Sequence, residues 1–98
     1  MRLKLMPDYG CYPLWNDDRP VGDIDPESLG LTPGLVADLL EWSDFFDSKL
    51  VWDDPASTHW SVEEAETFNR EGRRLMERLA DELGDGYEVR YFETSASI

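Results

Sequence analysis

Residues 61–84 read SVEEAETFNREGRRLMERLADELG, and this stretch predicts an amphipathic helix whose two ends are both marked. Ser61 and Glu64 have the spacing of a capping box at its start, and Gly84 is a typical stop at its end. Gly72 lies in the middle of the apolar stripe, where it costs about 1 kcal/mol of helix propensity. We therefore expect a neighbouring element to pack closely against Gly72. The stripe consists of Ala65, Phe68, Gly72, Leu75, Met76, Leu79 and Leu83.

The segments on either side of this helix predict an α+β domain. A turn leads into a final strand over 87–92, whose residues alternate between apolar and charged, and residues 2–6 alternate in the same way. Thr32 and Pro33 are typical of a helix start, with Thr32 as its cap, and this helix runs to about Ser48. The simplest arrangement is a small two-layer fold. Its terminal strands pair in a small sheet, and both helices pack on one face of that sheet.

The remaining segments are expected to be irregular. Residues 7–31 hold four of the six prolines, which predicts a long loop with a short strand over 12–15. A short extended piece is expected over 50–52, and a frayed tail over 94–98. With 98 residues, the chain is long enough for one domain and too short for two.

The charge is concentrated in the first half of the chain. The net charge is −13, and residues 8–54 carry twelve acidic side chains against two basic ones, Arg19 and Lys49. Aromatic side chains run through the same segment. Acids provide a long-range negative field and aromatics provide rigid contact area, so this combination favours a basic protein partner. It argues against direct binding of nucleic acids and of anionic membranes, which attract basic proteins.

Two groups of residues are candidates for the contact with that partner. The first helix carries an acidic face, and Phe45 projects between Asp38 and Glu41, as an exposed anchor would. Two alternatives remain open: the acids form an ordinary solvated face, or the loop over 7–31 covers Phe45. The predicted contact residues are Asp38, Glu41, Asp44 and Phe45 on the helix, with Trp15, Asp17, Asp18 and Trp52 elsewhere.

Catalysis and cofactor binding find little support in the residue pattern. Cys11 and His59 are the only residues of their kinds, so a zinc site would lack ligands, and nothing predicts that the two are adjacent. We therefore expect no enzyme activity and no cofactor. The acidic loop over 17–27 has oxygen ligands suited to calcium but lacks the EF-hand spacing, which leaves divalent-ion binding open. A lone cysteine forms no internal disulfide, and with no signal peptide or apolar span this favours the cytoplasm.

Over most of its length, the sequence resembles a group of small acidic actinomycete proteins. The resemblance rests on residues 6–15, which read MPDYGCYPLW, on 25–29 ahead of Thr32 and Pro33, and on 53–55. No activity is attached to that group, so the resemblance implies no functional residues.

These observations favour a non-enzymatic inhibitor or immunity protein that covers a cationic surface, such as that of a toxin nuclease. One alternative is a DNA mimic that blocks a nucleic-acid-binding effector. Another is a small metal-binding domain or enzyme, and a third is a housekeeping protein whose acidity reflects its host's proteome. The sequence leaves the oligomeric state open.

Overall fold

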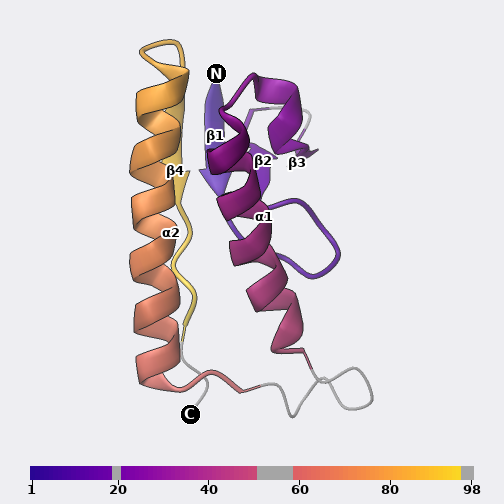
Figure 1. Ribbon diagram of the computed structural model, residues 1–98, viewed down its shortest axis with the longest axis vertical. Helices are drawn as coiled ribbons and strands as arrows, with labels where there is room; N and C mark the ends of the chain where they lie inside the picture. The colour runs from indigo at the N-terminus through magenta and orange to yellow at the C-terminus, as the bar shows by residue number, and fades with distance from the viewer. Residues whose placement is uncertain (19–20, 51–58, 96–98) are drawn as a thin grey trace.

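The computed structural model describes residues 1–18, 21–50 and 59–95 and shows a four-stranded sheet with two helices on one of its faces (Figure 1). The predicted α+β class is confirmed. The elements, in chain order, are β1 Arg2–Leu5, β2 Leu14–Asn16, β3 Gly22–Ile24, the 3-10 helix η1 Pro26–Leu29, α1 Pro33–Ser48, α2 Val62–Leu83 and β4 Glu88–Tyr91.

The sheet brings the first and last strands together. Its strand order is β3-β2-β1-β4, and β1 pairs in parallel with β4, with Leu3 opposite Val89 and Leu5 opposite Tyr91. The other neighbouring strands, β1 with β2 and β2 with β3, are antiparallel. Leu3 and Leu5 are fully buried, as expected for the strand face that the helices cover. The predicted pairing of the terminal strands is confirmed.

The segment 7–31 is more regular than its sequence suggested. The strand expected over 12–15 lies at Leu14–Asn16, and β3 pairs with it through Trp15 opposite Asp23. The helix η1 begins after Asp25, whose side chain accepts a hydrogen bond from the backbone N–H of Glu27. The prediction of an irregular loop was therefore wrong for β3 and η1.

The two α-helices lie side by side and run in opposite directions (Figure 1). Helix α2 begins with the predicted capping box, in which Ser61 Oγ accepts from the N–H of Glu64 and Glu64 Oε1 accepts from the N–H of Ser61. Thr32 is the N-cap residue of α1, as expected, but its side chain makes no capping hydrogen bond. Its hydroxyl donates to Glu82 Oε2 at 2.8 Å, which ties the start of α1 to the end of α2. Neither helix combines the length and apolarity needed to cross a membrane.

Gly72 marks the closest packing between α2 and the sheet. A Cβ atom at this position would lie within 2.6 Å of Tyr91 Cζ, so only glycine leaves room for the ring. The Tyr91 hydroxyl donates to Asn69 Oδ1 at 2.7 Å, and Asn69 also exchanges two hydrogen bonds with the backbone of Thr94. The expected packing against Gly72 is confirmed. These bonds also show that the chain is still held at Thr94, where fraying was expected, and residues 96–98 lie outside the described part.

Candidate functional site

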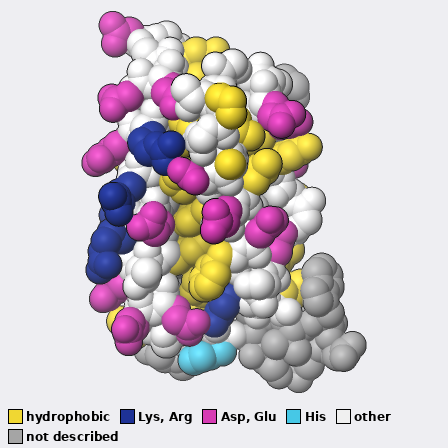
Figure 2. Space-filling view, viewed as in Figure 1, with side chains coloured by type: hydrophobic (Ala, Val, Ile, Leu, Met, Phe, Trp, Pro, Cys, Tyr) yellow, Lys and Arg dark blue, Asp and Glu magenta, His cyan; other side chains and the backbone are white. Residues whose placement is uncertain are grey.

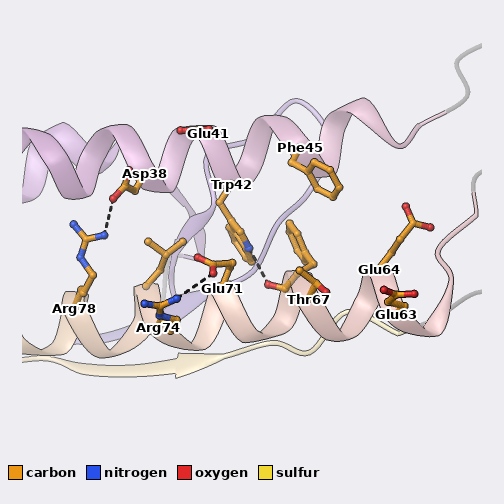
Figure 3. A pocket seen from close by; sticks show the side chains of 12 residues that line it. Asp38, Glu41, Trp42, Phe45, Glu63, Glu64, Thr67, Glu71, Arg74 and Arg78 are labelled. Carbon is orange, nitrogen blue, oxygen red and sulfur yellow. Dashed lines mark hydrogen bonds and ion pairs between the residues drawn. The ribbon is translucent and has the colours of Figure 1, made fainter.

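The candidate site is a groove between α1 and α2, on the side of the helices that faces away from the sheet (Figure 3). Its volume is about 640 Å³. The antiparallel packing of the two helices puts one flank of each along the groove. The lining residues are Asp38, Glu41, Trp42 and Phe45 of α1, with Glu63, Glu64, Thr67, Phe68, Glu71, Arg74, Leu75 and Arg78 of α2.

The floor of the groove is built from stacked aromatic rings. Trp42 and Phe68 stack with their centroids 4.3 Å apart and their planes 7° from parallel, and Trp42 Nε1 donates to the carbonyl oxygen of Phe68 at 3.1 Å. The ring of Phe45 lies 6.0 Å from those of Phe68 and Trp60, yet Phe45 remains 48% exposed. Because several rings support it, Phe45 forms a fixed apolar surface that is open to a partner.

Acidic groups dominate the rim. Five carboxylates and only two guanidinium groups line the groove. Figure 2 shows the apolar floor in yellow between magenta carboxylates, with a row of arginines along α2 in dark blue. The rim therefore presents a negative edge around an aromatic floor, which suits a partner that is both basic and apolar.

Ion pairs join the two helices near each end of the groove. Arg78 donates to Asp38 Oδ2 at 2.6 Å (Figure 3), and Lys49, just after α1, donates to Glu64 Oε2 at 2.5 Å. Hydrogen bonding to Lys49, reinforced by the backbone N–H of Ser61, lowers the pKa of Glu64 to about 2. The carboxylate of Glu64 therefore stays charged at any ordinary pH.

Not every acid of the rim is engaged in this way. Within the described residues, Glu41 and Glu63 form no ion pair or hydrogen bond through their side chains. Glu71 pairs only with Arg74, at 3.3 Å on the exposed surface of the same helix, which is a weak interaction. The middle of the groove therefore keeps carboxylates that a partner can reach.

The structure brings three of the predicted contact residues together. Asp38, Glu41 and Phe45 line the α1 side of the groove, and the loop over 7–31 does not cover Phe45. That loop instead packs on the next residue, where Tyr9 stacks on Phe46 with centroids 4.6 Å apart. Asp44 is exposed on α1 but does not line the groove. Whether the three groove residues bind a partner stays a prediction.

The other predicted contact residues lie elsewhere. Trp15 is on the open face of the sheet, where its Nε1 donates to the carbonyl oxygen of Met6 at 2.9 Å. Asp17 accepts from Arg90 Nε at 2.6 Å and Asp18 from Arg2 Nε at 2.9 Å. Trp52 lies outside the described residues. Trp15, Asp17 and Asp18 therefore lie apart from the groove, and whether they contact a partner stays a prediction.

Hydrogen bonding also explains the pKa directions of these two loop acids. The side-chain bond from Arg90 lowers the pKa of Asp17, and the bonds from Arg2, first of all its backbone N–H, lower that of Asp18. Asp23 and Asp25 accept from the backbone N–H groups of Tyr12 and Glu27. In the described part of the chain, no three potential metal ligands come together.

The thiol of Cys11 lies in an unfavourable environment for a nucleophile. Partial burial raises its pKa, and the negative charges of Asp8, Asp23 and Asp47 raise it further. A raised pKa lowers the fraction of the reactive thiolate.

Sequence reasoning missed the α2 side of the groove. The contact residues that it named all precede α2, although eight of the lining residues come from that helix. A usable signal was present, because Glu64, Glu71 and Arg78 recur every seven residues and so share one flank of α2. Reading that spacing against the apolar stripe would have placed these three side chains beside Phe68 and Leu75.

Comparison with known proteins identifies the family of this chain. No curated protein matches the chain. The resemblance to small acidic actinomycete proteins stays a prediction. The family model described as Serratia CdiI immunity protein-like matches residues 1–94, which is nearly the whole chain. The chain therefore belongs to the Serratia CdiI immunity protein-like family.

Proposed function

We propose that this chain is an immunity protein that neutralises a contact-dependent protein toxin by binding a basic surface of that toxin. The observation that carries the proposal is the groove between α1 and α2, where an exposed Phe45 lies on a supported aromatic floor with a mostly acidic rim. The family gives the immunity role, and the groove gives the complementary chemistry of the partner.

The proposed mechanism is occlusion without chemistry on the toxin. The acids of the rim attract a basic surface over a distance, and this mainly raises the association rate. The aromatic floor then makes the desolvated contact that slows dissociation. A toxin nuclease suits this mechanism well, because a nuclease must keep a basic surface for its own substrate. The lone Cys11 keeps the cytoplasm as the predicted place of action.

The arginines of α2 make a DNA mimic a weaker candidate. Four of them, Arg70, Arg73, Arg74 and Arg78, are exposed along that helix. A surface that imitates the phosphates of a duplex needs an uninterrupted negative track. Positive charges at the rim suit a patterned protein surface better, because they add selectivity against wrong partners.

The first test asks whether inhibition is stoichiometric. A toxin domain encoded near this chain's gene is purified, and its activity is measured while the chain is added. A binder gives an end point at a fixed molar ratio that does not move with incubation time. If a small fraction of the chain progressively inactivated the whole toxin, the chain would be an enzyme and the proposed mechanism would be wrong.

The second test asks whether the groove is the contact. Phe45→Ala should weaken toxin binding about 10- to 100-fold, mainly through faster dissociation. Glu41→Gln should slow association and make the rate less sensitive to salt. Surface plasmon resonance at two salt concentrations measures both rates. The matched control is Asp44→Asn, which removes the same charge from α1 outside the groove. Equal effects of Glu41→Gln and Asp44→Asn would place the contact elsewhere.

A further inference from the structure

One of the chain's own cations, the ammonium group of Lys49, is bound near one end of the groove. Lys49 Nζ lies 5.3 Å from the centroid of the Trp60 ring and 2.5 Å from Glu64 Oε2. The ammonium group is thus held between an aromatic face and a carboxylate, and its side chain is only 19% exposed. This arrangement combines a cation–π contact with a charge-assisted hydrogen bond.

The same two ingredients, a ring and carboxylates, recur in the middle of the groove, where the described residues show no cation–π contact to Phe45 and no ion pair to Glu41. Phe45 lies one helical turn before Lys49, and its ring is half exposed. Glu41 lies one turn before Phe45 on α1, Glu71 lies on α2, and both line the groove (Figure 3). Glu41 has no partner among the described residues, and the Glu71–Arg74 pair is long and exposed. An incoming cation would therefore displace little.

We propose that the middle of the groove accepts one arginine or lysine side chain of the toxin, with its alkyl stem on Phe45 and its charge between Glu41 and Glu71. This inference rests on the proposed function and names the anchor that the toxin supplies. A purely apolar anchor fits less well, because it would desolvate the carboxylates of Glu41 and Glu71 without pairing them. A cationic side chain satisfies the rings and the carboxylates together.

The first experiment replaces the aromatic ring of Phe45 while keeping the side chain apolar. Phe45→Leu keeps an apolar side chain but removes the π face, whereas Phe45→Trp provides a stronger one. A cationic anchor predicts that Phe45→Leu weakens binding of the purified toxin about 3- to 30-fold and that Phe45→Trp binds at least as tightly as the wild type. Thermal melting of each variant confirms that the fold is intact.

A scan of the toxin completes the test. Each arginine and lysine of the toxin is changed to methionine, which keeps an apolar stem and removes the charge. One such change should weaken binding to the wild-type chain and have a smaller effect on Phe45→Leu, as a double-mutant cycle detects. Exchanging that residue between arginine and lysine then shows which cation the groove prefers.

The possible failures are distinguishable. If Phe45→Ala weakens binding while Phe45→Leu does not, the anchor is apolar, and this inference is overturned while the proposed function stands. If no single cation of the toxin couples to Phe45, the inference is also overturned. If the toxin does not bind the wild-type chain at all, both proposals fall.

Discussion

The carboxylates of residues 17–18 and those of residues 38–44 resemble each other in the sequence but have different partners in the structure. Asp17 and Asp18 lie on the open face of the sheet, where Arg90 and Arg2 of neighbouring strands neutralise them. On α1, Asp38 pairs with Arg78, and among the described residues no cation pairs with the other predicted acids, Glu41 and Asp44. Whether a carboxylate is neutralised in this fold therefore depends on whether another element brings an arginine or lysine close to it.

Packing differs between the same two sides of the molecule. On the sheet side of α2, Gly72 makes room for Tyr91, and the Tyr91 hydroxyl bonds to the buried Asn69. Burial raises the pKa of Tyr91, so this hydroxyl stays protonated and donates. On the groove side, Phe45 remains half exposed although several rings surround it. The sheet side of α2 is therefore closely packed, whereas the groove side leaves about half of Phe45 exposed.

The largest expected effect tests the packed side. Gly72→Ala should lower the free energy of unfolding by about 1–3 kcal/mol, because the new methyl group overlaps the Tyr91 ring. Gly34→Ala is the matched control in α1, since a Cβ there meets nothing within 4 Å. It should be neutral or stabilise by up to about 1 kcal/mol through helix propensity. Urea unfolding measures both. The same sign for the two changes would contradict the close packing at Gly72.

An intermediate effect concerns the charge that closes one end of the groove. The pKa of Glu64 falls from 4.5 to about 2 on folding, so its contribution to stability is complete above about pH 5. As the pH falls through the folded-state pKa, that contribution is lost. The difference in melting temperature between the wild type and Glu64→Gln should therefore shrink between about pH 5 and pH 2.

Glu63→Gln is the control for this pH dependence. Glu63 lies beside Glu64 at the start of α2 but has no ion pair among the described residues. Its difference from the wild type at neutral pH should be smaller than that of Glu64→Gln, because Glu63→Gln breaks no ion pair among the described residues. A similar pH profile for the two variants would show that Lys49 does not hold Glu64 in solution.

The smallest expected effect is the change in melting temperature when a single acid is removed, either beside the sheet or in the groove. Asp17→Asn removes a carboxylate that Arg90 holds with two hydrogen bonds, so it should lower the melting temperature slightly. Glu41→Gln removes an unpaired carboxylate and should leave the melting temperature unchanged or raise it a little, since it relieves repulsion in an acidic chain. Scanning calorimetry resolves the two signs. A larger loss for Glu41→Gln would mean that Glu41 supports the fold.

Much of the fold could be predicted because its signals are local. The capping box at Ser61, the stop at Gly84 and the alternation of the terminal strands are all set by neighbours in the chain. Strand β3 was missed because three residues, Gly22–Ile24, carry no pattern of their own and become a strand only by pairing with β2. Thr32 is the N-cap residue that the sequence predicts, but the sequence does not show that its hydroxyl bonds to Glu82.

Only one side of the candidate site could be predicted from local sequence patterns. The spacing of Asp38, Glu41 and Phe45 places them on one flank of a helix, and that prediction needs only the helical period. The opposite flank depends on how α2 is rotated against α1, which is decided by the packing of Phe68 on Trp42. The ion pairs of Asp17 and Asp18 join residues far apart in the chain, so no local sequence pattern predicts them.

The parallel pairing of β1 with β4 has a consequence for the timing of synthesis. Strand β1 is synthesised long before its neighbour β4 leaves the ribosome, and the α-amino group of Met1 also donates to the carbonyl oxygen of Gly86. Until then Asn69 lacks Tyr91 and Thr94, and the notch at Gly72 stays empty. We therefore expect the two-layer fold to close only after β4 has been synthesised and has docked beside β1.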